Sequence, residues 1–404
     1  DRKERDEKVQ NICEEAGIPI LKLWTSYGIN TEYIKKRILE LFDKINPEKL
    51  SLFTEEEGNI SENIILHNIV ESDFALIGMN ESANKIRQEF YKLKQHNNTL
   101  KIIDLGNLKQ GQTPRDTYFA LGEVCSTLFQ YQIIPIIIGG THDNAIGIYK
   151  GYETISQIIN IVNIDSHIDL KDIEKEPKKD NFLAHLFCSD PNYLFNYTHL
   201  AYQTYFVHNS VLKLFQDLRF EAYRLGEIQS EIEKSEPLIR NCDMLIADIN
   251  AIRASDSPAS RSPHGLYGEE FCKLLHYAGA NDKLTSLGLF NYDAEKDPLS
   301  LTAQLLSHAI WYFIDGYLWR KNDFPYRDLN SYYRFNVLME NEETLVFFKS
   351  KKSGRWWLQI NCSDESKQKY SRHYLIPCTY EDYQEAMKNK IPDRFILAHN
   401  KLNL

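Results

Sequence analysis

Residues 158–169 have the sequence IINIVNIDSHID, an Ile- and Val-rich run followed at once by two aspartates and a histidine. Similar transitions occur at 133–142, IIPIIIGGTH, and at 244–250, MLIADIN. Short β-branched runs bounded by Gly or polar residues are typical of strands buried in a parallel sheet. Side chains just past the carboxyl ends of parallel strands face one crevice, where open α/β sheets bind ligands. We therefore expect these segments to meet in one polar site.

The polar residues of these segments are types that bind divalent cations. They are His142, Asp165, His167, Asp169, Asp248 and Asn250. Imidazole, carboxylate and amide groups suit hard or borderline ions. Alternate side chains of an extended segment point the same way, so residues 165–169 can supply three ligands. A DxHxD motif alone also fits a surface loop. Gly139-Gly140 alone also fits a simple strand-to-helix turn, and it is a weak candidate for a phosphate-binding loop because no Lys-Ser/Thr follows it.

The middle of the chain alternates between predicted strands and helices, which indicates a parallel sheet covered on both faces. Strands are expected at 74–79, 100–106, 133–138, 158–164, 200–207, 220–226, 244–249 and 283–290. Helices are expected at 83–94, 116–132, from about 143, at 210–216, 269–280 and 302–318. The loop 253–265, RASDSPASRSPHG, follows the third polar segment and can shape the mouth of the crevice.

The chain is divided by its composition into four parts. We expect a small α/β fragment at 1–45 and a polar linker at 46–70. The α/β domain is expected at 71–325, followed by a C-terminal extension with a hairpin and a helix at 326–404. Trp356 and Trp357 in that hairpin fit either core packing or a docking surface. The first residues, DRKERDEK, contain neither Met nor an apolar signal, so we expect a cut edge there.

Composition excludes several classes of function. With 47 basic and 57 acidic residues the net charge is −10, and no basic run is present, so we expect no nucleic-acid partner. Apolar runs are too short for a membrane span, and we expect no membrane partner. The 7 cysteines have no CxxC spacing, which favours free thiols and a cytoplasmic location over disulfides or structural zinc.

The three polar segments resemble the motifs of the ureohydrolase family, which contains arginase, agmatinase and formimidoylglutamase. That family has GGDHS, DAHxD and SxDxDxxDP, where this chain has GGTHD, DSHID and ADINAIRA in the same order. The resemblance covers residues 70–322. Other segments, including the RWW and LIPC tail, resemble a divergent Bacteroidetes-type branch labelled formimidoylglutamase-like. The resemblance implies a three-layer α/β fold with a mostly parallel sheet, a small C-terminal extension and a homo-oligomer.

The resemblance also implies two manganese ions and their ligands. The first ion would be held by His142, Asp165, Asp169 and Asp248. The second would be held by His167, Asp165, Asp248 and residue 250, so that Asp165 and Asp248 bridge the pair. Two close cations lower the pKa of a shared water, which can then attack the planar carbon of an amidine or guanidinium substrate. Asp169 would also accept the hydrogen bond that aims the nucleophile.

The chain departs from the family at several positions. Asn250 replaces an Asp, which removes one negative charge and is expected to weaken the second ion site. Arg253-Ala254 replaces the Asp-Pro that ends the third motif, and Thr141 replaces an Asp beside His142. Asn291 falls where the family has a Glu that pairs with the substrate, although it also fits a plain strand-end residue.

The histidine that shuttles protons in the family has two candidates here, His185 and His264. His185 lies in the apolar segment FLAHLF and also fits a packed core residue, whereas His264 follows Pro263 in a loop and also fits an exposed residue. Two functions remain open. The first is a manganese-dependent hydrolase of linear amidines or guanidines, formimidoylglutamase- or arginase-like, with an attenuated second site. The alternative is a non-catalytic pseudoenzyme that binds or scaffolds.

Residues 1–45 carry a second, separate resemblance. Their RDEK helix and GIPIL strand resemble the tail of a restriction-endonuclease-like domain. The acidic nuclease residues of that fold are absent from these 45 positions, so no nuclease activity is expected from them.

Overall fold

The computed structural model of the chain describes residues 72–94, 100–171, 176–325 and 329–403. The α/β fragment and the endonuclease-like resemblance at 1–45, together with the linker at 46–70, lie outside the described residues. All residues singled out for metal binding, substrate binding and proton transfer are described.

An eight-stranded sheet forms the centre of the α/β domain, with strand order β2-β1-β3-β8-β7-β4-β5-β6. Every neighbouring pair in this sheet is parallel. Its strands are β1 (Phe74–Gly78), β2 (Ile102–Asn107), β3 (Ile134–Ile138), β4 (Ile159–Ile164), β5 (Leu194–Tyr202), β6 (Glu221–Arg224), β7 (Met244–Asp248) and β8 (Ser286–Phe290). Strands β1, β3, β4, β7 and β8 are buried at every residue, as expected for apolar runs covered on both faces.

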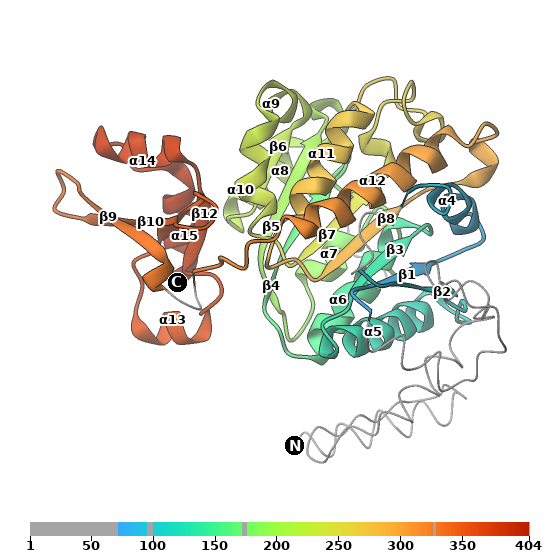
Figure 1. Cartoon of the computed structure of the whole chain (residues 1–404), viewed down its shortest axis with the longest axis horizontal. Helices are drawn as coiled ribbons and strands as arrows, with labels where there is room; N and C mark the ends of the chain where they lie inside the picture. Colours follow the sequence, from blue (N-terminus) through green and yellow to red (C-terminus); the bar gives the residue numbers. More distant parts are fainter. Residues whose placement is uncertain (1–71, 95–99, 172–175, 326–328, 404) are drawn as a thin grey trace, which may run out of the picture. The chain divides into compact units, whose positions relative to one another are not determined.

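Helices cover both faces of this sheet, and the predicted three-layer α/β fold is confirmed. The helices are α4 (Ala83–Phe90), α5 (Pro114–Gln130), α6 (Ala145–Thr154), α7 (Phe182–Phe187), α8 (Asn209–Asp217), α9 (Leu225–Ser230), α10 (Ser235–Ile239), α11 (Gly268–Gly279) and α12 (Leu301–Leu318). Helices α5 and α6 pack together on one face, and α11 and α12 pack together on the other (Figure 1).

The start of α5 shows how sequence sets a helix boundary. Thr113 precedes the helix and its hydroxyl accepts a hydrogen bond from the Asp116 backbone, while the Asp116 carboxylate accepts one from the Thr113 backbone. Pro114 occupies the first helical position, where its missing N–H costs nothing. This capping box satisfies backbone donors that would otherwise lack partners.

The prediction of a strand at 200–207 is wrong in its bounds. Strand β5 spans Leu194–Tyr202, and Thr204–Phe206 form a short 3-10 turn. Polar residues inside the strand concealed the apolar pattern, but the sheet satisfies them. The Asn196 amide donates to Glu221 in the neighbouring strand at 2.9 Å, and buried His199 contacts the backbone oxygen of Asp165 at 3.0 Å.

The described part of the C-terminal extension, residues 329–403, forms a sheet of its own. Four antiparallel strands have the order β12-β11-β10-β9, of which only the β10–β11 hairpin was predicted. The elements are β9 (Tyr332–Leu338), β10 (Thr344–Ser350), β11 (Trp356–Gln359), α13 (Asp364–Lys369), β12 (Leu375–Cys378), α14 (Tyr380–Met387) and α15 (Asp393–Leu402). Trp356 and Trp357 are both buried, which supports core packing over a docking surface.

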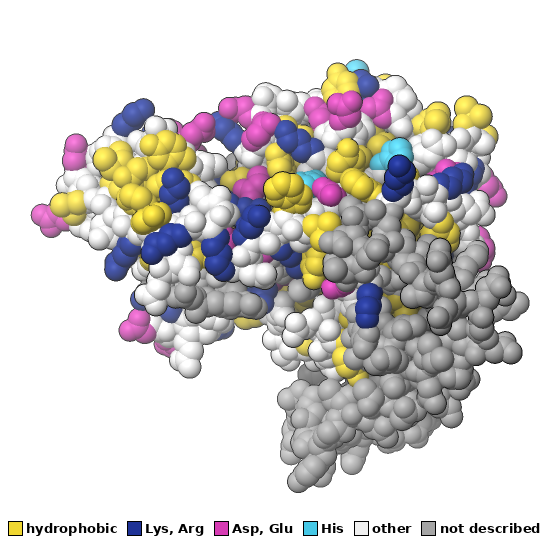
Figure 2. Space-filling view, viewed as in Figure 1, with side chains coloured by type: hydrophobic (Ala, Val, Ile, Leu, Met, Phe, Trp, Pro, Cys, Tyr) yellow, Lys and Arg dark blue, Asp and Glu magenta, His cyan; other side chains and the backbone are white. Residues whose placement is uncertain are grey.

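Some hydrophobic side chains of the extension do reach the surface. Tyr333, Leu338, Tyr380 and Met387 are exposed. Figure 2 shows hydrophobic side chains gathered on the drawn face over this part of the chain, with basic and acidic side chains interspersed around them. Single exposed apolar residues are normal on protein surfaces.

A buried ionic cluster joins the extension to the α/β domain. Asp243, just before β7, is fully buried; one carboxylate oxygen lies 3.3 Å from the Lys283 ammonium and the other accepts a hydrogen bond from Arg372 of the extension. The next residue, His373, is buried against the backbone oxygen of Ile158, 3.3 Å from its Nε2. Burial, with the nearby positive charges of Lys283 and Arg372, holds the pKa of His373 well below its usual value.

The six cysteines in the described residues are free. Burial raises the pKa of the Cys125 and Cys242 thiols, which keeps them protonated and unreactive. Among the helices of the described ranges, none combines the length and apolar character needed to cross a bilayer.

Helices α11 and α12 approach so closely that two glycines are required between them. A Cβ added at Gly279 would lie 1.9 Å from the Phe313 carbonyl oxygen, and one at Gly316 would lie 2.1 Å from the His276 carbonyl oxygen. We expect Gly279→Ala to lower the free energy of unfolding by about 3 kcal/mol, because two backbones must separate. Urea denaturation measures this change.

Gly226 is the matched control, because a Cβ there has no neighbour within 4 Å. Gly226→Ala in α9 should be neutral or stabilising by up to about 1 kcal/mol. Equal effects of the two alanine substitutions would contradict the close approach of α11 and α12.

His373 should make stability depend on pH. Its folded pKa lies below the ordinary value of 6.5, so the unfolded chain binds a proton more readily than the folded one. The stabilisation is therefore complete above pH 6.5 and is lost as the pH falls below it, by about 1.4 kcal/mol per pH unit at most. Urea denaturation of the native protein and of His373→Gln at pH 7.5 and 5.5 tests this. An identical loss in both proteins would show that another group is responsible.

Candidate metal centre

Four adjacent strands in the middle of the sheet deliver the polar residues to one edge. In the order β3, β8, β7 and β4, their carboxyl ends are followed by His142, Asn291, Asn250 and Asp165, and β7 itself ends at Asp248. Strands β3 and β4 follow each other in the chain but are separated in the sheet by β8 and β7. Open α/β sheets bind ligands at positions where the strand order changes in this way.

A double-glycine turn makes the exit from β3 possible. Gly139 and Gly140 have φ values of +76° and +73°, which side chains rarely allow, and a Cβ at Gly140 would lie 2.7 Å from that of Met79. The Gly140 carbonyl accepts a hydrogen bond of 2.7 Å from the backbone of Asn291. The turn therefore fixes the position of Asn291 and leads directly to His142.

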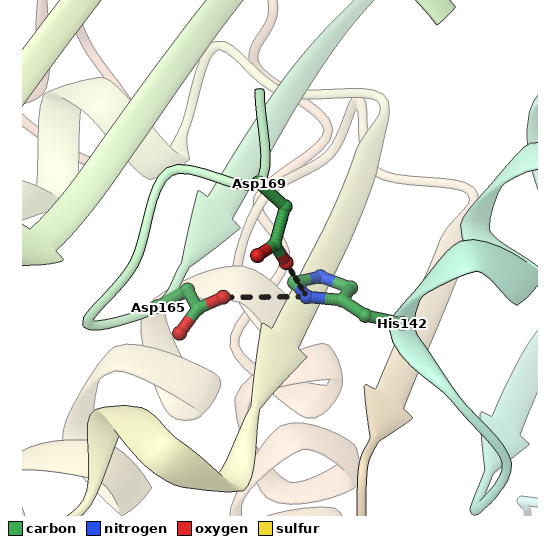
Figure 3. A group of neighbouring side chains, drawn as sticks. All are labelled: His142, Asp165 and Asp169. Carbon is green, nitrogen blue, oxygen red and sulfur yellow. Dashed lines mark ion pairs between the residues drawn. The ribbon is translucent and has the colours of Figure 1, made fainter. Parts of the chain in front are cut away.

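His142 is the centre of a compact cluster. Its Nδ1 lies 3.3 Å from an oxygen of Asp165, 3.3 Å from an oxygen of Asp169 and 3.4 Å from an oxygen of Asp248. Figure 3 shows the carboxylates of Asp165 and Asp169 approaching this nitrogen from two directions. Ligand atoms that lie about 2.1–2.3 Å from one ion, at right angles to each other, are about 3 Å apart. The spacing therefore fits a shared cation.

The burial of His142 points to the same conclusion. The side chain is fully buried, and neither ring nitrogen forms a hydrogen bond among the described residues. Its ring lies between those of Phe182 and Phe290, with centroids 4.6 and 5.7 Å away. Buried polar atoms normally have partners, so a cation shared with the three carboxylates would explain the Nδ1 atom.

The electrostatics of the cluster also favour a cation. Burial, together with the charge of Asp248, raises the pKa of Asp165 to about 8. Burial alone would lower the pKa of His142, but Asp165, Asp169 and Asp248 outweigh it and hold that pKa well above its usual value. Three carboxylates in a dry site repel one another, and a divalent ion would relieve this repulsion.

Two of the six predicted ligands lie outside this cluster. The His167 ring is partly buried, its Nδ1 lies 2.8 Å from the Ser166 hydroxyl and its face stacks on Phe206 at 4.0 Å. The backbone of Asn250 donates to Asp248 at 2.7 Å. The four residues predicted to hold the first ion therefore lie together, whereas, within the described residues, the side chains of His167 and Asn250 form no hydrogen bond or ion pair with them.

Asn291 is in direct contact with the cluster. Its side-chain amide donates a hydrogen bond to the Asp248 oxygen that faces His142. Its φ of +63° lies in the left-handed region, which Asn tolerates better than most residues. The residue predicted to bind substrate is therefore held against a carboxylate that is predicted to bind metal.

Residues 75–315 match the sequence profile described as the arginase family. The chain belongs to the arginase family.

Curated relatives and solved structures agree with this assignment. The formimidoylglutamase of Staphylococcus haemolyticus is 22% identical over 309 residues, which is 72% of this chain and 97% of that protein. A crystal structure of Trypanosoma cruzi formiminoglutamase with Mn2+2 has a TM-score of 0.57 at 16% identity, covering 70% of this chain and 99% of that one. The formimidoylglutamase structure from Bacillus subtilis has a TM-score of 0.56 at 14% identity, covering 77% and 99%.

The two candidate proton-shuttle histidines of this arginase-family chain occupy different surroundings. His185 lies on α7, half-buried, and burial lowers its pKa. Its Nε2 has no hydrogen-bond partner among the described residues. His264 is exposed, and its carbonyl oxygen accepts hydrogen bonds from the Gln203 amide at 2.9 Å and the Ser262 hydroxyl at 2.6 Å. Among the described residues, no hydrogen bond joins either side chain to the cluster of His142 and the three aspartates.

Sequence reasoning missed His199, which supports the cluster from β5. It is fully buried, and its Nε2 lies 3.0 Å from the backbone oxygen of Asp165, while Nδ1 lies 3.1 Å from the Tyr197 hydroxyl. Burial lowers the pKa of His199 to about 3, so the ring stays neutral. A single His in an apolar strand resembles an ordinary core residue, and only the pairing of β4 with β5 reveals its contact.

The raised pKa values predict that a divalent ion will displace protons. At pH 7 Asp165, with a pKa of about 8, and His142 carry protons that must leave before the ion binds. Mn2+ affinity should therefore rise as the pH increases above 7, because these protons leave more readily. Calorimetric titration in two buffers with different ionisation enthalpies measures the number of protons released. Release of no protons by the native protein would contradict the assignment.

Proposed function

We propose that this arginase-family protein is a manganese-dependent hydrolase that cleaves a C–N bond of a linear amidine or guanidine. The observation that carries the proposal is the buried His142 imidazole, whose Nδ1 faces oxygens of three aspartates at 3.3–3.4 Å. An inert core would not gather three carboxylates at one buried nitrogen, because each would need its own donor.

The proposed roles follow the placement of each side chain. His142, Asp165, Asp169 and Asp248 would hold the first Mn2+, and His167 and Asn250 would join Asp165 and Asp248 in holding the second. Ions bound there would lower the pKa of a shared water to near neutrality. Asp169 is the least buried carboxylate of the cluster, so it can also accept the hydrogen bond that orients the attacking water.

Proton transfer to the leaving amine is assigned to His185, with His264 as the second candidate. The backbone N–H of Leu183 donates to the carbonyl of Asp169 at 3.4 Å, so the helix that carries His185 begins against the cluster. The lowered pKa of His185 keeps its ring neutral at pH 7, and its Nε2 has no described partner. A neutral imidazole with a free nitrogen can accept and pass on a proton.

The second ion should bind more weakly than the first. Asn250 provides no charge where the family motif has an Asp, so the three aspartates alone face two divalent ions. In addition, Nδ1 of His167 contacts the Ser166 hydroxyl and its ring stacks on Phe206, so this side chain must turn or use Nε2 to bind an ion.

The substrate is proposed from the relatives of the chain. Curated relatives of the chain include several formimidoylglutamases, and one similar solved structure, with a TM-score of 0.54, is an agmatine ureohydrolase of Thermoplasma volcanium. Formimidoylglutamate is therefore the first substrate to test, followed by arginine and agmatine. The free buried thiols fit an enzyme of a reducing cytoplasm.

Metal content and turnover test the proposal together. The protein is loaded with Mn2+, bound ions are counted by mass spectrometry, and release of formamide, ammonia or urea is measured. We expect turnover of at least one substrate, and we expect His142→Asn to lose most of both metal and activity. A fully loaded protein that hydrolyses none of the substrates would instead be a non-catalytic binding protein.

Restoring the family residues tests the weakened second site. Asn250→Asp adds a carboxylate ligand and should tighten the second ion by at least about tenfold, which equals about 1.4 kcal/mol. Asn291→Glu should change turnover separately, because it replaces the amide that contacts Asp248. Asn336→Asp, on exposed strand β9, is the matched control for the added charge and should change neither quantity. Equal second-ion affinity in the native protein and in Asn250→Asp would show that the second site is not weakened.

A further inference from the structure

The four-stranded sheet of the C-terminal extension ends on one side at β9, which has β10 as its only neighbour among the described strands. The two strands pair from Tyr332 opposite Ser350 to Leu338 opposite Thr344 without a bulge. The edge of a sheet exposes backbone N–H and C=O groups that can pair with another strand, and folded proteins often protect it with Pro, Lys or a bulge. Strand β9 has none of these three devices.

The other edge of this sheet, β12, is protected. Pro377 has no N–H to offer, and its carbonyl oxygen accepts a hydrogen bond from the Arg394 guanidinium at 3.0 Å. All four residues of β12 are buried. In β9, by contrast, Tyr333, Asn336 and Leu338 are exposed, and Leu338 is exposed at 75%. One edge of the sheet is therefore closed, whereas the other presents apolar side chains to solvent.

The hydrogen bonds at the two ends of β9 show which of its backbone groups face the open edge. The N–H of Met339 donates to the Glu343 carbonyl at 2.8 Å, and the carbonyl of Ser331 accepts from the N–H of Lys351 at 3.0 Å. Bonded residues alternate along an antiparallel pair, so the odd-numbered residues of β9 bond to β10. The backbone groups of the even-numbered residues, including the central Asn336, therefore face away from β10.

The β9–β10 hairpin carries opposite charges at its two ends. Glu340, Glu342 and Glu343 lie in the turn that joins the two strands. Lys351 and Lys352 lie at the other end, directly after β10 and beside the start of β9. Within the part of the chain that the structure describes, no ion pair is found for any of these five side chains. Their charges are therefore available to a partner at the open edge.

We propose that two copies of this chain associate by antiparallel pairing of their β9 edges, which joins the two four-stranded sheets into one. A two-fold axis through such a pair places the acidic turn of each copy at the basic end of the other. The charges then attract at both ends of the interface, whereas a parallel pair would bring like charges together. The proposal concerns the extension and does not depend on the proposed hydrolase function.

The side chains of β9 are also complementary to themselves in the register that pairs the most residues. This register is centred on Phe335, the middle residue of the strand, and places it opposite the partner's Phe335. Tyr333 then lies opposite the partner's Val337, and Arg334 lies opposite the partner's Asn336. Aromatic pairs and pairs of aromatic with β-branched residues stabilise antiparallel strands. Apolar groups thus meet apolar groups, and polar groups meet polar ones.

Sedimentation velocity of the full chain at several concentrations measures the association. We expect the native protein to reach about twice the mass of Asn336→Pro, because Pro removes an N–H that faces the open edge and none that bonds to β10. Asn336→Ala keeps this N–H and is the matched control, which should associate like the native protein. Thermal denaturation verifies that the Pro variant is folded. Equal masses of the native protein and folded Asn336→Pro at the highest concentration would overturn the proposal.

Charge reversal tests the antiparallel orientation without a proline in the strand. Glu340→Lys combined with Glu342→Lys brings like charges together at both ends and should weaken association at least tenfold. Adding Lys351→Glu and Lys352→Glu to this variant restores opposite charges and should recover the native affinity. Glu365→Lys, a charge reversal at an exposed position of α13, is the control and should associate normally. Failure of the four-residue variant to recover association would refute the pairing.

Discussion

The arrangement of the protein depends on holding three carboxylates and one imidazole together in a dry volume. Asp165, Asp169 and Asp248 repel one another there, and burial together with the charge of Asp248 raises the pKa of Asp165. The surrounding scaffold opposes it with fixed geometry. The double-glycine turn directs His142 inward, and His199 anchors the backbone of Asp165. The ligand groups of such a site are in place before an ion binds, and metal-dependent hydrolysis requires this preorganisation.

Much of this could be predicted from short sequence patterns, because the patterns are local. Apolar runs ending in Gly or Asp mark the central strands, and the residues after them form the site, so β3, β4 and β7 were placed correctly. Strand β5 was misplaced because its polar residues, such as His199, break the apolar run. Their hydrogen-bond partners come from β4 and β6, more than twenty residues away, and no local pattern contains that information. Most of the extension's sheet escaped prediction for the same reason.

The contacts of His167, Asn250 and Asn291 could not be predicted from the motifs that contain them. His167 stacks on Phe206, and Asn291 donates to Asp248. A sequence motif specifies which groups are available, whereas rotamers and competing hydrogen bonds determine whether those groups point at a common centre.

The ionic cluster around Asp243 lies at the amino ends of β4 and β7, while the carboxylates that face His142 follow their carboxyl ends. The strands themselves separate the two by their full length. Changes to the extension can thus alter the stability of the domain without moving the side chains at the carboxyl ends of the strands. A disturbance that begins in the extension therefore reaches the amino ends of β4 and β7 first, and the carboxylates near His142 only through the length of these strands.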